Sequence, residues 1–402
     1  MIGVEEARRL VLASVRGAIA AETLTLEQAP GRTLAEAVTA PHDIPPFASS
    51  AMDGFVVAPG PAGRRLRIAG EARAGHPSPV TADAGEAIRI STGAPLPPGG
   101  GAVVPLERVS EDRGGIILES PVGERDHVRG AGEDVEAGAT VLAAGTRVGP
   151  VELGVAAACG RAELSCVSRP LVAVLATGDE LVAPGTPLGA GQIYDSNAIV
   201  LAAAARRAGA TVQLHARVGD DAGATQQALA TALEQADVMV VSGGVSVGPH
   251  DHVKGALAAL GVQERFWRVA LRPGKPTWFG VASEKLVFGL PGNPVSACVC
   301  FALFVVPALR ALLGREPIAP RMQALLAAPV AASPEREQAI GVRVEHSGDR
   351  VLAWPAGPQG SHRLSSLLGA QALALVPASE VELPAGTPVE LESLADSFDV
   401  SL

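Results

Sequence analysis

The sequence predicts a multidomain protein of the α/β plus β class, with a doubly wound α/β domain at its centre. Three continuous apolar runs support this fold, at residues 171–176, 238–241 and 286–290. Runs of this kind are typical of central strands in a parallel sheet that is covered on both faces. Helical segments alternate with the runs, and this alternation predicts a doubly wound domain over residues 169–318.

The helices of this domain are marked by residues that commonly begin or end helices. Asp221 is a candidate N-cap, because its carboxylate can accept a backbone N–H of the first helical turn. Gly209 and Gly261 follow two further helical patterns, at the position where glycine commonly ends a helix. The predicted helices are 198–208, 222–234 and 251–260.

A mostly-β module is predicted between residues 41 and 139, where short apolar runs are broken by glycine and proline. The expected strands are 55–57, 87–90, 102–104 and 115–118. Short strands also return after Pro320 and predict a small β-barrel at the C-terminus.

A helical linker is predicted on both sides of the β module. Apolar residues near helical spacing indicate helices at 4–20 and 150–159, and we expect the second to return to the first, with a further helix near 34–38. The predicted domains are a helical linker domain (1–40 and 140–168), an inserted β domain (41–139), the α/β domain (169–318) and a C-terminal β-barrel domain (319–402).

Composition argues against several classes of protein. The net charge of −10 disfavours non-specific nucleic-acid binding, which requires a basic face. The N-terminus has no secretory apolar region, and the most apolar segment, 295–309, is shorter than a membrane span, so we expect a buried or interface helix there. The four cysteines have no zinc-like spacing. We therefore expect a cytoplasmic protein with reduced thiols that binds neither nucleic acid nor membrane.

Five residues of types that this chain uses rarely lie close together in sequence. The chain has only two asparagines, one tyrosine and three lysines. Most of them fall in glycine-rich turns after apolar runs, which indicates a specific role; chance clustering is the alternative. The five residues are Tyr194, Asn197, Lys254, Lys275 and Asn293.

Glycine-rich turns follow the three central strands, at the edge where open α/β sheets bind ligands. Glycine lets backbone N–H groups approach an anion, and the N-terminus of a following helix favours negative charge. The turns therefore predict an anion-binding edge. The candidate ligand-binding residues are Thr177, Gly178, Asp179 and Glu180 in the first turn, Ser242, Gly243, Gly244 and Ser246 in the second, and Pro291, Gly292, Asn293 and Pro294 in the third.

Cations and carboxylates occur near the same edge. Arg272 and Lys275, which are fixed by prolines, are candidates to hold phosphate or another oxyanion. Acidic residues beside phosphate-binding groups indicate Mg²⁺, which prefers oxygen ligands and bridges to phosphate. Helix capping is the alternative role for Asp221 and Asp251, and a solvated turn is the alternative for Asp179 and Glu180. The carboxylates are Asp179, Glu180, Asp220, Asp221 and Asp251.

Several familiar catalytic signatures are absent or misplaced. No G-x-G-x-x-G follows the first strand of the α/β domain, which disfavours a nicotinamide fold, and Gly274-Lys275 lacks the upstream glycine of a P-loop. Residues 244–248 match a G-x-S-x-G nucleophile elbow, but Ser246 lies several residues beyond its strand. An elbow places its serine directly at the strand end, so a serine hydrolase is disfavoured.

Taken together, the motifs resemble those of the molybdopterin molybdenumtransferases, the MoeA family that includes the E domain of gephyrin. The matching stretches occur in family order through most of the chain, which makes the combined signal specific. They are SAMDGF (50–55), STGAP (91–95), GED (132–134), TGDE (177–180), QIYDSN (192–197), SGGVSVG (242–248), PGKP (273–276), GLPGNP (289–294) and GSH (360–362).

The resemblance implies four domains, with a molybdopterin-binding α/β domain at the centre. It also implies an elongated homodimer, in which each cleft lies between the α/β domain of one subunit and the β domain of the other. The implied reaction takes adenylylated molybdopterin and molybdate with Mg²⁺, cleaves the pyrophosphate link, releases AMP and yields the molybdenum cofactor. A molybdopterin adenylyltransferase would then supply the substrate.

The resemblance also assigns roles to individual residues. Asp53 is one of them, although the residue alone would suggest a turn, because Asp-Gly is a common turn pair. The implied catalytic residues are Asp53, Asp134, Asp251 and Lys275; the implied metal ligands are Glu180, Asp220 and Asp251; Thr92, Tyr194, Asn197, Arg272 and Ser361 join the turn residues as ligand-binding residues.

The chain departs from the family pattern in places. The family commonly has Asp-Asn before SAMDG, basic residues before GED, an acidic residue after SVG, and lysine where this chain has Arg272, a change that keeps charge but not geometry. An arginine expected near 341 is shifted to Arg343 or lost. These departures put molybdate or metal handling in doubt. The positions of the departures are Ala48, Ser49, Gly130, Ala131, Pro249 and Arg272.

Two other functions remain open at this point. The departures motivate a non-catalytic pterin-binding or scaffold protein of the same fold, and an adenylyl-transfer enzyme on the same α/β fold is a further alternative. Molybdate and tungstate are both compatible with the residues.

Overall fold

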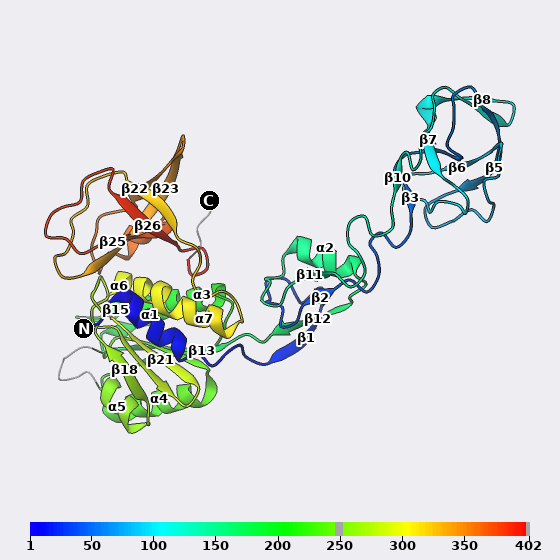
Figure 1. Ribbon diagram of the computed structural model, residues 1–402. Helices are drawn as coiled ribbons and strands as arrows, with labels where there is room; N and C mark the ends of the chain where they lie inside the picture. The colour runs from blue at the N-terminus through cyan, green and yellow to red at the C-terminus, as the bar shows by residue number, and fades with distance from the viewer. Residues whose placement is uncertain (246–251, 399–402) are drawn as a thin grey trace.

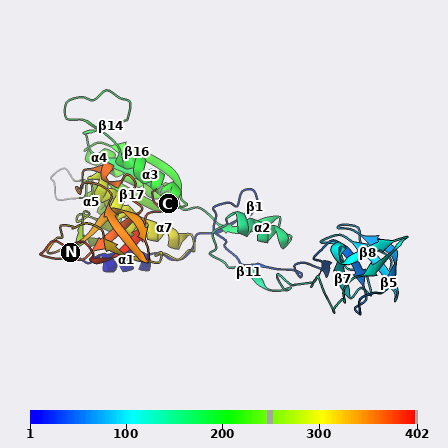
Figure 2. The ribbon, with the colours of Figure 1, turned by 90° about the horizontal axis from the view of Figure 1, so that it is seen from above.

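The computed structural model of the protein describes residues 1–245 and 252–398. The chain is elongated (Figure 1). The α/β domain and the C-terminal β domain lie together at one end, the inserted β domain lies at the other, and the linker domain lies between them, as the view from above also shows (Figure 2).

The α/β domain contains the predicted parallel sheet. The strand order is β16-β13-β17-β21-β20-β18, in which β16, β13, β17 and β21 are parallel and β20 is antiparallel to both of its neighbours. All three apolar runs are central strands, which confirms that prediction. The strands are β13 (Leu171–Thr177), β16 (Thr211–Val218), β17 (Val238–Ser242), β18 (Gln263–Trp267), β20 (Trp278–Ala282) and β21 (Lys285–Leu290).

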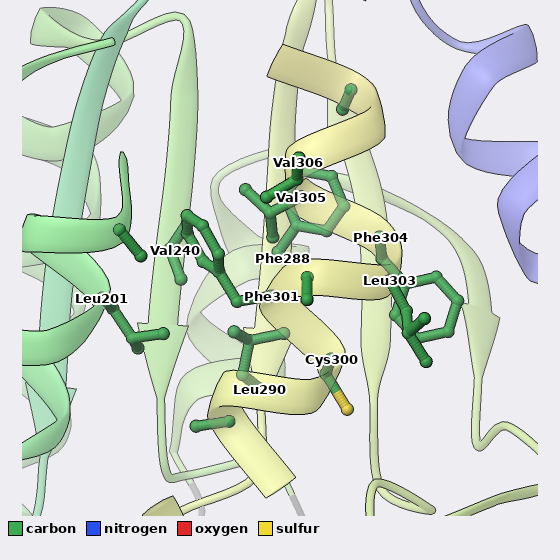
Figure 3. Packing of buried hydrophobic residues seen from close by; sticks show 14 of the residues in the cluster. Leu201, Val240, Phe288, Leu290, Cys300, Phe301, Leu303, Phe304, Val305 and Val306 are labelled. Atoms are coloured by element: carbon green, nitrogen blue, oxygen red, sulfur yellow. The ribbon is translucent and has the colours of Figure 1, made fainter. Parts of the chain in front are cut away.

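Helices cover both faces of this sheet. Because successive strand residues point to opposite sides, each central strand supplies side chains to both cores. In β13, Val172 and Val174 join the core under one layer of helices, whereas Ala173 and Leu175 join the core under the other. Figure 3 shows Leu201, Val240 and Phe288 in the first core, around the helix that carries Phe301. The first layer is α3 (Asn197–Arg207), α6 (Pro294–Cys300), the π-helix η2 (Phe301–Val305) and α7 (Val306–Leu312); the second is α4 (Ala222–Gln235) and α5 (Val253–Ala259).

The continuous helix Pro294–Leu312 is the predicted apolar helix, and it is longer than expected. It has 19 residues and a mean hydropathy of 2.2, so length and composition alone would let it cross a membrane. Its apolar window is 89% buried inside the protein, which is the burial of a core helix. Cys298 and Cys300 lie in it, and burial raises the pKa of both thiols to about 12.

The N-terminal helix α1 (Val4–Ala13) packs on this helix and not in the linker domain. Val4, Ala7 and Val11 form one apolar stripe and enter the core of the α/β domain. The expectation that residues 150–159 return to the first helix is therefore wrong. The helical spacing of apolar residues indicated which face of α1 is buried, but it did not indicate the helix on which that face packs.

A proline explains one contact of α1. Pro307 has no N–H, so the Leu303 carbonyl four residues earlier lacks the donor that a regular α-helix would supply. The Nε atom of Arg8 donates to this carbonyl at 3.0 Å, and the Arg8 side chain is only 1% exposed. Arg8 also pairs with Glu392 of the C-terminal domain, so one buried guanidinium connects α1, the long helix and that domain.

The linker domain is built from two chain segments with a shared core, in which Leu34 and Val38 meet Val148 and Leu164. Its helical content is smaller than predicted. Residues 34–38 do not form a helix, because Leu34 bridges Cys166 and Val38 begins a strand; cross-chain pairing overrides the local preference. The elements are β1 (Ala21–Thr25), β2 (Val38–Thr39), β11 (Thr140–Leu142), α2 (Pro150–Ala158) and β12 (Glu163–Val167), with β1 paired to β12 and β2 to β11.

The main sheet of the inserted β domain has six strands in the order β7-β4-β6-β5-β9-β8. The four predicted runs correspond to β4, β6, β7 and β9. The elements are β3 (Ser49–Ser50), β4 (Gly54–Val57), β5 (Arg65–Ala72), β6 (Glu86–Ile90), β7 (Ala102–Pro105), the 3₁₀-helix η1 (Leu106–Arg108), β8 (Val109–Asp112), β9 (Gly115–Leu118) and β10 (Val128–Arg129), which pairs with β3.

The C-terminal domain is the predicted small β-barrel. The sheet closes because β25 pairs with both β26 and β23, and β23, β24, β22 and β26 are joined in sequence around the ring. The elements are β22 (Met322–Leu326), β23 (Glu337–Ser347), β24 (Arg350–Pro355), the 3₁₀-helix η3 (Leu364–Leu367), β25 (Ala372–Val376) and β26 (Pro388–Ser393).

A network of charges lies where the barrel meets α1. Arg321 pairs with Glu5 and, at 2.7 Å, with Glu390. Glu337 lies close to the same group. Burial, together with repulsion from Glu5, raises the pKa of the Glu337 carboxyl above its ordinary value of 4.5, against the opposing effect of Arg321.

We predict that Glu337→Gln stabilises the protein at neutral pH. Because the folded pKa is raised, the Glu337 carboxyl costs no stability below pH 4.5, and its cost grows as pH rises through the folded pKa. The variant should therefore have a higher unfolding temperature than the original protein at pH 7 and the same one at pH 4, measured by scanning calorimetry. Glu335→Gln, at an exposed neighbour, is the matched control. An equal shift at both pH values would contradict this reading.

Candidate functional site

The carboxyl ends of the central strands bring the three predicted turns together. β13 ends at Thr177, β17 at Ser242 and β21 at Leu290, and these strands are direct neighbours in the sheet. The N–H of Gly243 donates to Leu290 O at 3.0 Å, which joins the second turn to the third. The turns therefore share one edge, as the strand pattern predicted.

Asn197, at the first residue of α3, connects two of these turns through its side chain. Its Nδ2 group donates to Ser242 Oγ at 2.9 Å and to the Gly292 carbonyl at 2.7 Å. The Ser242 hydroxyl in turn donates to Pro291 O at 3.3 Å. The Oδ1 atom of Asn197 is buried and has no hydrogen-bond partner among the described residues. Asn197 therefore sets the separation of the turns after β17 and β21.

The turn after β17 requires glycine at two positions. Gly243 and Gly244 have φ angles of 92° and 65°, in the region that favours glycine. A Cβ at Gly243 would lie 2.8 Å from Thr177 O, and a Cβ at Gly244 would lie 2.4 Å from Val253 Cγ2. The two glycines thus let this turn pack against both β13 and α5.

The turn that carries Lys275 is also fixed by close packing. Gly274 has a φ of 131°, and a Cβ there would lie 2.6 Å from the Cys300 sulfur. Thr277 Oγ1 donates to the Gly274 carbonyl at 2.6 Å, and Val269 N donates to Lys275 O at 3.0 Å. The buried Cys300 thiol, whose pKa is about 12 because of burial, packs beneath this turn as an unionised group.

This turn forms one wall of a cavity of about 720 Å³ between the α/β domain and the barrel. The two domains are joined here by β19 (Leu271–Arg272), which pairs in parallel with Glu337 and Gln338 of β23. Five predicted site residues line the cavity, which are Arg272, Lys275, Pro291, Asn293 and Ser361.

The cavity is strongly cationic. Arg272, Lys275 and Arg336 line it together with His362, and no aspartate or glutamate is among the lining residues. Within residues 1–245 and 252–398, none of these three cations forms an ion pair. Cations that lack carboxylate partners are available to an anionic ligand.

Arg336 was not predicted from the sequence, where an arginine was expected near residue 341. Gly341 lines the cavity, and Arg343 is exposed on β23 and outside the cavity. Arg336 comes just before β23, and the pairing of β19 with β23 brings it to the cavity that Lys275 also lines. The sequence contained no local pattern that indicates this pairing.

The sheet edge and the cavity meet at Asn293. Its Nδ2 group donates to Ser361 Oγ at 3.2 Å, and Val295 N, in the first turn of α6, donates to Ser361 O at 3.0 Å. Pro294, another predicted residue, begins α6 directly after Asn293. The structure therefore brings together Asn293 and Ser361, which are 68 residues apart in sequence.

The predicted carboxylates are spread along the same edge. Asp179 Oδ1 accepts the backbone N–H of Asp220 at 2.9 Å, and the Glu180 side chain folds over Gly178, where a Cβ would lie 2.3 Å from Glu180 Oε2. Asp221 caps α4, since its side chain accepts Ala224 N at 2.7 Å. No group of three potential metal ligands occurs among the described residues. Asp251, Ser246 and Pro249 lie outside those residues.

Tyr194 lies beside this edge on a short strand pair, β14 (Leu181–Val182) and β15 (Ile193–Tyr194), and its side chain is 43% exposed. β15 leads through Asp195, which is buried and accepts Ala198 N at 2.9 Å, into α3. The predicted stretch 192–197 therefore serves to place Asn197.

The predicted residues of the β domain do not reach this site within one chain. Asp53 Oδ1 accepts the Thr92 backbone N–H at 2.8 Å, so these two residues lie together, and Asp134 is exposed. The linker domain separates this part of the chain from the cavity (Figure 1). The departures at Ala48, Ser49, Gly130 and Ala131 lie around the paired strands β3 and β10, at the base of the β domain.

The fold defines a protein in which an α/β domain and a barrel enclose a cationic cavity, with a β domain remote from it. Family models agree over nearly the whole chain: the MoeA N-terminal region (domain I and II) matches residues 2–160, the probable molybdopterin binding domain matches 173–311, and the MoeA C-terminal region (domain IV) matches 323–394. The chain belongs to the MoeA family of molybdopterin molybdenumtransferases.

Individual relatives show the same relationship. Molybdopterin molybdenumtransferase 2 of Mycobacterium tuberculosis is 39% identical over 98% of this chain and 100% of its own length. The molybdopterin molybdenumtransferase of Haemophilus influenzae is 37% identical over 79% of each chain. The crystal structure of a molybdopterin biosynthesis MoeA protein from Pyrococcus horikosii has a TM-score of 0.85 at 32% identity, and covers 98% of this chain and 99% of that one.

We predict that Asn197→Asp destabilises the α/β domain by about 1–3 kcal/mol, because a carboxylate cannot donate to the Gly292 carbonyl and leaves it without this partner. The change is measured by thermal unfolding followed with far-UV circular dichroism. Asn197→Ala is the comparison: it removes both hydrogen bonds without adding a charge, so it should cost less than the aspartate. An aspartate variant as stable as the original protein would show that the amide does not hold the two turns.

Proposed function

We propose that this protein is the transferase that inserts molybdate into adenylylated molybdopterin and releases AMP. The observation that carries this proposal is the cavity with Arg272, Lys275 and Arg336 in its walls. Both substrates are anions, and both must approach one another against their mutual repulsion. The relatives named molybdopterin molybdenumtransferase support the same reaction for this chain.

The residues of the site have separable tasks in this reaction. The three cavity cations neutralise the oxyanion and the phosphates, since an arginine or lysine gains most where no protein carboxylate competes. The N–H group of Gly292, in the turn after β21, is suited to hold the pyrophosphate or pterin part, whereas those of Gly178 and Gly243 already donate to Val218 O and Leu290 O. Asn197 keeps two of these turns in register.

Mg²⁺ fits the oxygen donors of the sheet edge. This ion commonly takes one or two carboxylates from the protein and completes its coordination with substrate phosphates and water. Glu180 and Asp220, exposed at the edge, are our proposed protein ligands, together with Asp251. When bound, Mg²⁺ would neutralise charge on the pyrophosphate as its link breaks.

The reaction site also needs the β domain of a second subunit. We propose that Asp53, Thr92 and Asp134 act in the cavity of the partner in a homodimer, because the linker domain keeps them away from the cavity of their own chain (Figure 1). We further propose a cytoplasmic enzyme that receives its substrate from a molybdopterin adenylyltransferase and binds neither membrane nor nucleic acid.

We predict that Lys275→Met and Arg336→Gln each lower kcat/KM for AMP release by about ten- to a hundredfold, the effect of losing one hydrogen bond to a charged group. The assay contains adenylylated molybdopterin, molybdate and Mg²⁺, and AMP is quantified by chromatography. Arg343→Gln, at an exposed arginine outside the cavity, should keep the original rate. Absence of molybdate-dependent AMP release by the original protein would exclude the proposed reaction, and tight pterin binding in that case would favour a scaffold.

We predict that two impaired variants, one altered in the β domain and one in the cavity, complement one another. When Asp53→Ala and Lys275→Met chains are mixed and allowed to exchange subunits, each mixed dimer has one cleft with both original residues, so about one quarter of the original activity should return. Each variant alone should keep its own reduced activity under the same conditions. No recovery, with subunit exchange verified by native mass spectrometry, would mean that the two residues serve one cleft within a chain.

A further inference from the structure

Trp267 contacts the chain on both sides of the segment that joins β17 to α5. Its Nε1 group donates to the Val245 carbonyl at 3.2 Å. The ammonium group of Lys254, in the first turn of α5, lies over the Trp267 ring at 3.5 Å from the ring centroid. One indole therefore holds the last described residue after β17 and the start of the following helix.

A second cation lies against the same ring. The Arg268 guanidinium is 4.1 Å from the Trp267 centroid. Arg268 has a φ of 69°, which is unfavourable for a residue with a side chain. Its backbone is held there by two hydrogen bonds, from Arg268 N to Thr277 O at 2.9 Å and from Ile2 N to Arg268 O at 3.2 Å. The strained backbone places Arg268 beside the ring of the residue before it.

The indole lies at the ligand-binding edge of the sheet. β18 is antiparallel to β20, and β20 is antiparallel to β21, so β18 runs parallel to β21 and ends at the same edge. Trp267 is the last residue of β18. Its partner Val245 directly follows the turn of Ser242, Gly243 and Gly244, and a Cβ at Gly289 would lie 2.5 Å from Val245 Cγ1.

Lys254 has no carboxylate partner among the described residues, and its ammonium group instead contacts the face of Trp267. A cation–π contact of this kind is strongest where the ring is shielded from water, and this indole is half-buried. The scarce lysine of α5 is thereby explained by its partner and not by a ligand.

We propose that Trp267 is a positioning residue, which places the turn 242–245 and the first turn of α5 through its N–H group and its ring, and so sets the affinity for the adenylylated pterin. This role rests on the proposed function, since it concerns the turn that would hold that substrate. Trp267 would act through this turn, since it is not among the residues that line the cavity. Its loss should therefore raise KM and leave kcat nearly unchanged.

The test compares Trp267→Phe, which keeps a ring but removes the N–H donor, with Lys254→Met, which removes the cation. Trp354→Phe, at an exposed tryptophan of the barrel, is the matched control. Two measurements are made on the full-length protein: hydrogen–deuterium exchange of the free protein, and steady-state kinetics of molybdate-dependent AMP release.

For Trp267→Phe we expect faster hydrogen–deuterium exchange in peptides that contain residues 240–245 and 252–258, and no change in the peptide of 294–305. We also expect KM to rise about fivefold, the effect of one lost hydrogen bond. Lys254→Met should raise KM about two- to fivefold, and the double variant should lose less than the product of the two, because both act through one indole. The control should match the original protein.

Unchanged exchange in these two peptides, or a fall in kcat with KM unchanged, would overturn the proposal. So would an equal effect of Trp354→Phe. The two hypotheses fail separately: an original protein that releases no AMP refutes the proposed function, whereas the exchange measurement still decides whether Trp267 holds the turn.

Discussion

The cavity between the α/β domain and the barrel depends on one short strand pairing, between β19 and the start of β23. Leu271 and Arg272 form β19 and pair in parallel with Glu337 and Gln338 at the start of β23, which joins the α/β domain to the barrel. This pairing brings Arg336 of the barrel and Lys275 of the α/β domain to the walls of one cavity. Without it each domain would present separate surface cations, and neither would enclose a cavity for an anion.

A buried charged group, the Arg8 guanidinium, contacts both the α/β domain and the barrel where these two domains meet. Pro307 cannot donate to the Leu303 carbonyl inside the long helix, and Arg8 donates to this carbonyl instead. Arg8 also pairs with Glu392. A buried ion pair is weak evidence for stability, but removing one partner is costly because the other remains buried and unpaired. These contacts therefore restrict how the barrel packs on the α/β domain, and so restrict the shape of the cavity between them.

The sequence predicted the site well where the signal was local. A glycine that must adopt a positive φ, as at Gly243, and a carboxylate that caps a helix, as at Asp221, express a requirement of their own backbone. Arg336 was missed, because its role depends on a strand pairing with a segment far along the chain. The first helix was predicted correctly, but the prediction of its packing partner was wrong for the same reason.

By itself, the sequence determined the doubly wound sheet, the β-rich flanking modules and the turns of the ligand-binding edge, since apolar periodicity and backbone preferences are local properties. Only the tertiary structure decided which of these residues meet. It joined Asn197 to Ser242 and Gly292, closed the barrel over the Lys275 turn, and left the β domain away from the cavity of its own chain. Contacts between segments far apart in sequence are set by packing and pairing, which no short window of residues specifies.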